Sequence, residues 1–343
     1  MTQTLLLTRP VPQAGREILE GAGVTLRLAV EDPESLPSRE SLERGIQGAD
    51  AVLSLLTESI DEELLRAAPG LRGVANMAVG LDNVDVAAAT VLGIPVSNTP
   101  GILTETTADL AFALLLVVAR RIPRADRYTR AGHFRAWGPE LFVGLDLGPG
   151  ADGRAKTLGI VGFGRIGQAV ARRAVGFGMR VLAHDPGHRE RVEKDPVARW
   201  AELDELLAGS DFVSLHVPLY AGTRHLIGPA ELGRMQRTAI LVNTSRGSVV
   251  DERALVEALR AGRIAGAGLD VYEDEPALAP GLAELENAVL LPHVGSASRS
   301  TRDGMARAAA ENALAHLRGG RAPSCVNPEV YEGEAYRLRV TRR

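Results

Sequence analysis

The chain has 343 residues, of which 45% are hydrophobic and 24% are charged, so it is long enough for two domains and has the balance of a soluble globular protein. This composition excludes a disordered or fibrous chain. The formal net charge of −4 supplies no basic field to attract nucleic acid or anionic lipid, so we expect neither as a partner. The single cysteine, Cys325, permits neither an internal disulfide nor a thiolate metal site, and we predict no bound metal.

We expect a cytoplasmic protein without a membrane segment. The first residues, Met1 to Thr4, lack the basic start and the long apolar stretch of a secretion signal. The longest apolar run, Leu110–Ala119, is far shorter than the ~20 residues that cross a bilayer.

Short apolar runs alternate with longer amphipathic segments along almost the whole chain, a pattern typical of parallel sheets covered by helices. Helices are predicted early in the chain at Gln13–Glu20 and at Asp61–Ala68, the second capped by Ser59 or Asp61. Strands are predicted around them at Thr4–Thr8, Val24–Leu28, Ala51–Leu55, Arg72–Asn76 and Ile94–Ser97.

A long helix is predicted to begin at Thr104, to run through Leu110–Ala119 and, after a break near Pro123, to continue to His133. It is apolar almost all round, which indicates burial between domains or between subunits. A loop rich in glycine, proline and aspartate follows at 144–155.

A second alternating series begins at Thr157 and ends with a helix predicted at Ser300–Arg318. Beyond Pro323 the chain is predicted to be a solvated, basic tail. The strands of this series are predicted at Leu158–Val161, Arg180–Ala183, Phe212–Leu215, Ala239–Asn243, Ile264–Leu269 and Val289–Leu291.

A glycine-rich turn lies between the first strand of this series and a helix. Residues 162–167 read Gly-Phe-Gly-Arg-Ile-Gly, the G-x-G-x-x-G pattern that binds a dinucleotide when it joins a strand to a helix. Gly162 permits the tight turn, Gly164 lets a pyrophosphate approach the backbone, and Gly167 lets the helix pack closely on the strand. The N–H groups at the start of the helix are then available to the phosphates.

Asp185 follows the next predicted strand and indicates the choice of cofactor. A carboxylate at this place accepts hydrogen bonds from the adenosine ribose and repels a 2′-phosphate, so we favour NAD(H) over NADP(H). His188 and Arg189 lie close by in the sequence and weaken this preference.

Polar residues also follow the later strands of the series, where open α/β sheets bind their ligands. Arg246, Glu275 and His293 would emerge at the same edge as the glycine turn. Reduction of a 2-keto acid needs such groups, because a guanidinium binds carboxylate and carbonyl oxygens while a histidine supplies the proton. Backbone N–H groups near Val79 and Gly80 could hold a carboxylate, or the segment could be an ordinary loop.

The chain resembles the D-2-hydroxyacid dehydrogenase family, and most closely its glyoxylate/hydroxypyruvate reductase branch. The likeness runs from about residue 3 to residue 328, with its motifs in the family's order. The segments that carry it are Val79–Asp85, Asn98–Gly101, Thr104–Asp109, the glycine turn, Asn243–Gly247, Gly266–Val271, Glu275-Pro276 and Pro292–Ala297.

The resemblance implies two doubly wound parallel-sheet α/β domains. A flavodoxin-like substrate domain would comprise residues 1–103 and 300–328, and a Rossmann cofactor domain would be inserted at 104–299. The active site would lie in the cleft between them, and residues 329–343 would form the C-terminal tail. A homodimer through the cofactor domain is also implied.

The resemblance assigns roles to particular positions. His293 would be the acid/base, Glu275 its partner and Arg246 the substrate clamp. Leu55, Val79 and Gly80 would contact the substrate, and Trp137 would reach toward the active site of the second subunit. The cofactor contacts would be Gly162, Phe163, Gly164, Arg165, Ile166, Gly167, Asp185, Pro218, Thr223, Thr244, Ser245, Asp270 and Gly295.

The function predicted is therefore the NAD(H)-dependent reduction of glyoxylate or hydroxypyruvate to the D-2-hydroxy acid. Asp185 departs from the branch, many members of which carry an NADP-favouring arginine turn at this place. Two alternatives stay open: a dinucleotide-sensing regulatory protein of corepressor type, and a dehydrogenase of the same family that acts on phosphoglycerate or phosphite.

Overall fold

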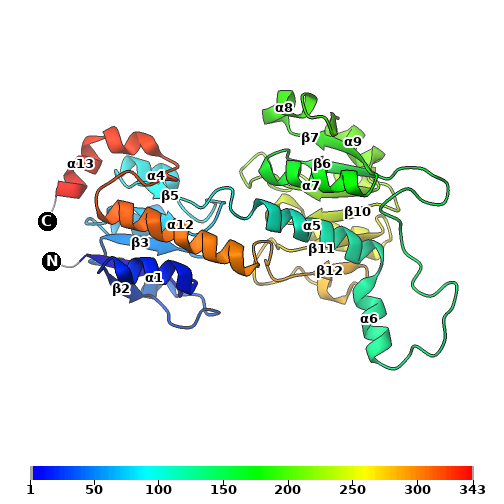
Figure 1. Ribbon diagram of the computed structural model, residues 1–343, viewed down its shortest axis with the longest axis horizontal. Helices are drawn as coiled ribbons and strands as arrows, with labels where there is room; N and C mark the ends of the chain where they lie inside the picture. Colours follow the sequence, from blue (N-terminus) through cyan, green and yellow to red (C-terminus); the bar gives the residue numbers. More distant parts are fainter. Residues whose placement is uncertain (1–2, 342–343) are drawn as a thin grey trace. The chain divides into compact units, whose positions relative to one another are not determined.

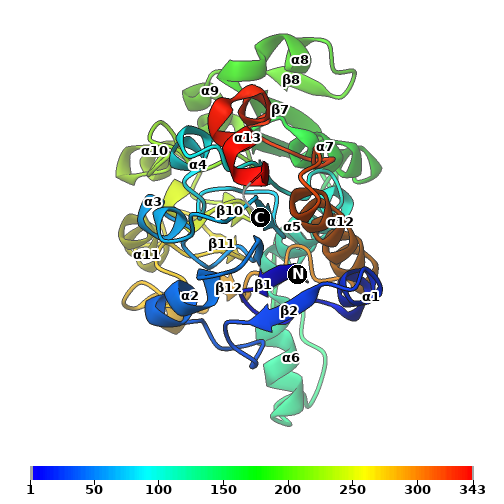
Figure 2. The same cartoon turned by 90° about the vertical axis from the view of Figure 1, so that its left-hand side faces the viewer.

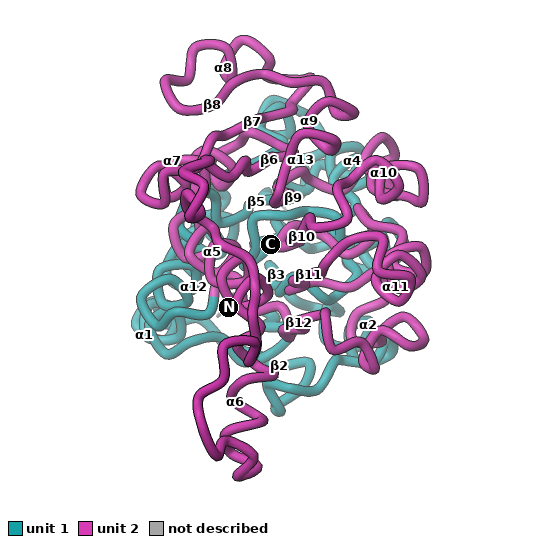
Figure 3. The backbone as a smooth tube through the Cα atoms, turned by 90° about the vertical axis from the view of Figure 1, so that its right-hand side faces the viewer, with its two compact units in different colours: residues 1–103, 297–343 teal, residues 104–296 magenta. Residues whose placement is uncertain are grey.

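The computed structural model describes residues 3–341 and divides them into two compact units (Figure 3). Unit 1 comprises the residues up to Leu103 and those from Ala297 onward, and unit 2 comprises Thr104–Ser296. Arg342 and Arg343, which belong to the predicted tail, lie outside the described residues. Within residues 3–341 no helix is both long enough and apolar enough to span a bilayer.

Unit 1 is built on a parallel five-stranded sheet in the order β2-β1-β3-β4-β5, which is the flavodoxin-like order. Its strands are β1 Thr4–Leu7, β2 Thr25–Leu28, β3 Ala51–Ser54, β4 Val74–Asn76 and β5 Val96–Ser97. Its helices are α1 Gln13–Gly21, α2 Arg39–Ile46, α3 Glu62–Arg66, α4 Val86–Val91, α12 Arg299–Leu317 and α13 Glu334–Thr341, with a 3-10 turn at Pro328–Glu332.

Alternation along the strands of unit 1 fills two apolar layers. Helices α1 and α12 cover one face of the sheet, and α2, α3 and α4 cover the other (Figure 2). Leu5 and Leu7 pack in the first layer, and Leu6 packs in the second. All three side chains are at most 1% exposed. Because both faces of the sheet are covered, its central strands appear in the sequence as unbroken apolar runs.

Unit 2 contains a parallel seven-stranded sheet in the order β12-β11-β10-β9-β6-β7-β8 (Figure 3). Its strands are β6 Thr157–Val161, β7 Arg180–His184, β8 Ala198–Trp200, β9 Phe212–Leu215, β10 Ile240–Asn243, β11 Gly266–Leu269 and β12 Ala288–Leu290. Its α-helices are α5 Thr104–Ala119, α6 Ile122–Arg130, α7 Arg165–Gly176, α8 Arg189–Glu193, α9 Leu203–Gly209, α10 Pro229–Arg234 and α11 Glu252–Arg260, and 3-10 turns occur at Pro186–His188, Gly247–Val249 and Leu282–Glu284.

The strand order of unit 2 is that of a Rossmann sheet extended by one strand, with the order reversing between β6 and β9. Helices α5 and α7 cover one face of the sheet, and α9, α10 and α11 cover the other (Figure 3). The predicted fold class, two doubly wound parallel-sheet units of which one is a Rossmann domain, is therefore confirmed.

The structure shows what the apolar helix contacts within the chain. Helix α5 packs against β10, β11 and α7 of unit 2 with one side, while Leu110, Ala113 and Val117 on it are not buried, so its burial against a second subunit stays a prediction. The break falls at Arg121, whose φ is +53°, and α6 then ends at Arg130, three residues before the predicted end. The short edge strand β8 was not predicted.

The predicted solvated tail is also wrong. Up to Thr341 the residues after 328 pack onto unit 1, with the rings of Tyr331 and Tyr336 edge to face at 5.1 Å. The guanidinium of Arg339 donates to the carbonyls of Leu92, Pro69 and others nearby. The arginines of this segment indicated a solvated tail, but its tyrosines are buried and one of its arginines anchors it.

Candidate active site

The residues predicted for catalysis in unit 2 lie on loops at one edge of the sheet. Because all the strands are parallel, the loops that follow β6, β7, β9, β10, β11 and β12 all leave from the same edge. The reversal of strand order between β6 and β9 lies in the middle of that edge, which is where doubly wound sheets bind nucleotides.

The glycine turn has the shape that a bound pyrophosphate requires. Gly162 has a φ of +93°, and a Cβ there would lie 2.6 Å from the carbonyl carbon of His216. A Cβ on Gly167 would lie 2.2 Å from the carbonyl oxygen of Gly162, so α7 can pack closely only with glycine at this position. Gly164 precedes the first helical residue of α7 and has no atom within 4 Å of its would-be Cβ.

Asp185 follows β7 and is bound to the glycine turn. Its Oδ2 accepts the backbone N–H of Phe163 at 2.9 Å, and its Oδ1 lies 3.2 Å from Nδ1 of His188. The carboxylate is therefore held beside the turn, at the place where a ribose would lie.

The second observation in favour of a dinucleotide concerns Thr244, which follows β10. Its hydroxyl is buried and has no partner within residues 3–341, although buried hydroxyls are almost always hydrogen-bonded. Open space at Gly164, the free helix start and this hydroxyl together fit a dinucleotide held by the glycine turn, Asp185 and Thr244.

The loop that carries Arg246 is folded by Asn243, the last residue of β10. The Asn243 side chain accepts from the backbone N–H of Ser245 at 3.0 Å and donates to the carbonyl of Arg246 at 2.8 Å. Gly247 then passes so close to the backbone of Tyr272 that a Cβ would lie 1.8 Å from its carbonyl carbon. This contact places the arginine loop beside the loop that carries Glu275.

Glu275 and His293 form a hydrogen-bonded pair. Oε2 of Glu275 lies 2.9 Å from Nδ1 of His293, and Oε1 accepts the backbone N–H of Tyr272 at 3.0 Å. Burial pushes the pKa of Glu275 upward, but the hydrogen bond and charge of His293 and the charge of Arg246 outweigh it, so this pKa lies below its ordinary value. Both side chains of the pair remain 26% exposed.

Asp270, the residue after β11, holds the histidine loop in place. Its two carboxylate oxygens accept the N–H groups of Val294 and Gly295, at 2.7 and 2.8 Å, and its carbonyl accepts that of His293 at 2.9 Å. These bonds stabilise the φ of +53° at His293, a conformation that few residues other than glycine adopt. Burial raises the pKa of Asp270, although the two amides and the charge of His293 oppose the rise.

The predicted cofactor contacts Pro218 and Thr223 lie on the loop after β9, at the same edge of the sheet. The hydroxyl of Thr223 is used within its own turn, where it donates to the Pro218 carbonyl at 2.6 Å. Trp137 lies in the irregular segment after α6 with 79% of its surface exposed. The predicted substrate contacts Leu55, Val79 and Gly80 belong to unit 1, on the loops that follow β3 and β4.

Two residues with a role at this edge were not predicted. Thr107 of α5 donates to the Gly295 carbonyl at 3.2 Å, and the buried carboxylate of Glu252 accepts the N–H groups of Glu273 and Ala279, on either side of Glu275. Both act through bonds to backbone far away in the chain, which leave no signal in the sequence.

Among residues 3–341 no three His, Cys, Asp or Glu side chains gather in a metal-binding cluster.

Comparison with known proteins defines the class to which this geometry belongs. Residues 112–295 match the D-isomer specific 2-hydroxyacid dehydrogenase, NAD binding domain. A glyoxylate reductase of Korarchaeum cryptofilum (strain OPF8) is 52% identical over 333 residues, which cover 96% of this chain and 97% of that protein.

Two solved structures extend the similarity to the whole fold. A protein of Thermus thermophilus matches with a TM-score of 0.84 and 45% identity over 94% of this chain and 100% of that one. An NADPH-dependent glyoxylate/hydroxypyruvate reductase of Sinorhizobium meliloti, solved with NADP and malonate, matches with a TM-score of 0.81 and 32% identity over 96% and 98%. The chain therefore belongs to the D-2-hydroxyacid dehydrogenase family, and unit 2 is its domain for a nicotinamide dinucleotide.

Proposed function

We propose that the protein reduces a small 2-keto acid, glyoxylate or hydroxypyruvate, to the D-2-hydroxy acid with NADH. The observation that carries the proposal is the Glu275–His293 pair, 2.9 Å apart, with the charge of Arg246 acting on it and the glycine turn at the same sheet edge. The curated relative named glyoxylate reductase, at 52% identity, supports this substrate class.

His293 is the proton donor in this mechanism. A nicotinamide dinucleotide held by the glycine turn, Asp185 and Thr244 would supply a hydride for the substrate's carbonyl carbon. Because Nδ1 of His293 faces Glu275, Nε2 is the nitrogen that gives its proton to the carbonyl oxygen. The Glu275 carboxylate fixes the orientation of the imidazole by accepting the hydrogen bond from Nδ1.

Arg246 and a loop of unit 1 orient the substrate. The guanidinium binds the substrate's carboxylate and stabilises the negative charge that develops on the carbonyl oxygen. The backbone N–H groups of Val79 and Gly80 bind the carboxylate, and Leu55 limits the size of the substrate.

Asp185 is the basis for proposing NADH. Its carboxylate, held by the N–H of Phe163, would receive the ribose hydroxyls and repel a 2′-phosphate. The structure from Sinorhizobium meliloti is named NADPH-dependent, so the choice needs a direct comparison of NADH and NADPH.

The test is the oxidation of NADH and of NADPH followed at 340 nm with glyoxylate, hydroxypyruvate and pyruvate. We expect fast turnover of the first two acids with NADH. The Arg246→Ala variant should lose about a hundredfold or more in kcat/KM while its Kd for NADH stays unchanged. His293→Asn should be nearly inactive, because general acid catalysis is worth roughly 10²- to 10⁴-fold.

Arg253→Ala, an exposed arginine of α11 in the same unit, is the matched control and should keep full activity. Equal losses of turnover and NADH binding in Arg246→Ala would contradict its role, and near-normal activity in His293→Asn would remove the histidine from the mechanism. Tight NADH binding without turnover of any keto acid would favour a regulatory protein. Turnover with NADPH alone would overturn the role of Asp185.

A homodimer through unit 2 is part of the proposal. Helix α6 buries none of its residues, and it extends away from the sheet of unit 2 together with the segment that follows it (Figures 1 and 3). Ile122, Phe134, Trp137 and Val143 expose large apolar side chains on this arm, as expected for a surface that a second copy covers. Sedimentation should give twice the 36.4 kDa of one chain; a monomer at micromolar concentration would contradict the dimer.

The cytoplasmic location stays a prediction from the sequence.

A further inference from the structure

The loop after β4, residues 77–83, is held from one side by asparagine side chains. The Val79 carbonyl accepts from Nδ2 of Asn98 at 2.9 Å. The Gly80 carbonyl accepts from Nδ2 of Asn76 at 3.1 Å. Two successive peptide groups of the loop are thus oriented by side chains that donate to their oxygens.

A third carbonyl, that of Ala78, is held in the same way by the backbone N–H and the hydroxyl of Thr99, at 2.9 and 3.1 Å. The peptide bonds here are trans, so each N–H points opposite to the carbonyl of its own peptide group. The N–H groups of Val79, Gly80 and Leu81 are therefore directed away from the side chains that hold the loop. Within residues 3–341 none of the three N–H groups meets an acceptor.

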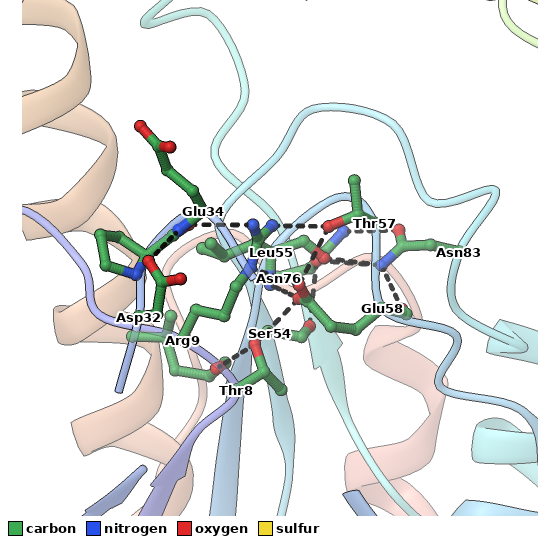
Figure 4. A network of polar contacts seen from close by, with 12 residues as sticks. Thr8, Arg9, Asp32, Glu34, Ser54, Leu55, Thr57, Glu58, Asn76 and Asn83 are labelled. Atoms are coloured by element: carbon green, nitrogen blue, oxygen red, sulfur yellow. Dashed lines mark hydrogen bonds and ion pairs between the residues drawn. The ribbon is translucent and has the colours of Figure 1, made fainter. Parts of the chain in front are cut away.

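Asn76 is itself fixed by a buried network (Figure 4). Its Oδ1 accepts from the hydroxyl of Ser54 at 3.0 Å, and its Nδ2 also donates to Oδ1 of Asn83 at 3.0 Å. Nδ2 of Asn83 donates to the carbonyls of Leu55 and Glu58, at 2.8 and 3.0 Å. The loops that follow β3 and β4 are thus tied to each other.

Glu58 links this network to the end of β1 and to the loop after β3. Its side chain is buried, with the residue 3% exposed, and it accepts from the hydroxyl of Thr8, the Nε of Arg9 and the backbone N–H of Leu55, at 2.8, 2.8 and 2.7 Å (Figure 4). Thr57 adds a further bond at 2.9 Å. A carboxylate with this many donors keeps the start of the loop after β3 in one conformation.

We propose that Asn98 and Asn76 are positioning residues for the substrate: by binding the carbonyls of Val79 and Gly80 they aim the N–H groups of Gly80 and Leu81 at the carboxylate of the 2-keto acid. Thr99 does the same for the N–H of Val79 through the Ala78 carbonyl. The inference rests on the proposed function and deepens it, adding the Leu81 N–H to the two amides and naming the groups that orient all of them. Without the asparagine donor the peptide group can rotate, and the amide then no longer faces the anion.

The loss of a positioning residue affects binding of the carboxylate more than the chemical step. Asn98→Ala should raise KM for glyoxylate and Ki for oxalate by the same factor, roughly 10- to 100-fold, because the Gly80 N–H is no longer held in place and loses its hydrogen bond to the charged carboxylate. The kcat should change less than about threefold, since the carboxylate is bound equally in the ground and transition states. Turnover of glycolaldehyde, which has no carboxylate, and the Kd for NADH should not change.

Asn327→Ala is the matched control. Asn327 is a buried asparagine of the same unit that bonds the backbone of Val96 and Ile94. Its loss should lower the Tm without raising KM. An unchanged KM in Asn98→Ala, with an active wild type, would overturn the inference and leave the proposed function standing. A wild type that reduces no keto acid would instead overturn the proposed function.

A second measurement does not depend on a variant that folds. In a ¹⁵N-labelled wild type, addition of oxalate should shift the amide resonances of Val79, Gly80 and Leu81 more than those of the rest of unit 1. Saturating oxalate, established by inhibition, that leaves the three resonances in place would overturn the inference.

Discussion

At the scale of single residues, two glycines of β11 allow a helix to lie against the sheet. A Cβ on Gly266 would lie 2.7 Å from Val118 and 2.8 Å from the carbonyl of Asn287, and one on Gly268 would lie 3.0 Å from Leu114. Helix α5 can therefore approach β11 closely. Asp270 directly follows this strand and binds the backbone of the histidine loop at Val294 and Gly295.

We predict that Gly266→Ala lowers the free energy of unfolding by about 1–3 kcal/mol, because a well-packed core resists an added methyl group. Gly176→Ala, at the end of α7 where a Cβ meets nothing within 4 Å, is the matched control and should be neutral or stabilise by up to ~1 kcal/mol. Urea unfolding of both variants measures the difference. An equal stability of the two would contradict the packing argument.

The candidate site shows what the sequence can and cannot predict at this scale. Arg246, Glu275 and His293 were predicted because strand ends and motif order place them at one edge. The bonds that set the geometry of the loops were not, because Asp270 holds backbone 24 residues away and Glu58 holds the side chains of Thr8 and Arg9, about fifty residues earlier. Such contacts follow from the packing of the sheet and not from local sequence.

At the scale of elements, strands buried on both sides were predicted within one or two residues. The strand that was missed, β8, is a short edge strand in which Arg199 is exposed, so it lacks the apolar run of its neighbours. The C-terminal helix α13 was missed because its few residues mix arginines with apolar side chains and only Tyr336 among them is buried.

Because Arg339 anchors α13, we predict that its replacement lowers the stability of the protein. Arg339 donates from Nε and Nη1 to carbonyls of unit 1, among them Leu92 at 2.6 Å and Pro69 at 3.0 Å. Arg339→Lys should cost about 1–3 kcal/mol in stability, because an ammonium group cannot reproduce the fork of a guanidinium. Arg337→Lys, on the same helix and exposed, should leave the Tm unchanged. A shift of equal size in both would mean that the hydrogen bonds of the Arg339 guanidinium to these carbonyls add nothing specific to the stability.

At the scale of the whole molecule, each unit carries a histidine that burial keeps neutral. Burial lowers the pKa of His316 in unit 1 to about 4 and that of His216 in unit 2 to about 3. His316 is fully buried, and its Nε2 lies 3.0 Å from the hydroxyl of Ser97 while Nδ1 has no partner in the described chain. A proton on Nδ1 has no acceptor there, so the folded state resists protonation of the ring.

The burial of His316 sets the direction in which the free energy of unfolding changes with pH. In the unfolded chain the imidazole takes up a proton near pH 6.5, whereas in the folded chain His316 does so only near its lowered pKa. Its stabilising effect is therefore fully present above pH 6.5 and is lost as the pH falls toward 4. Burial raises the pKa values of Glu252 and Asp270, and these two acids act in the opposite sense, because a raised carboxyl pKa favours the folded state as the pH falls.

The contribution of His316 is isolated by comparing the wild type with His316→Gln, since the two acids and His216 cancel in the difference. Between pH 7.5 and pH 5 we expect the wild type to lose about 2 kcal/mol more of its free energy of unfolding than the variant does, for a shift of this size. Urea unfolding at a series of pH values measures both curves. Parallel curves over this range would mean that the buried ring takes up a proton as readily in the folded chain as in the unfolded chain, which would contradict the lowered pKa of His316.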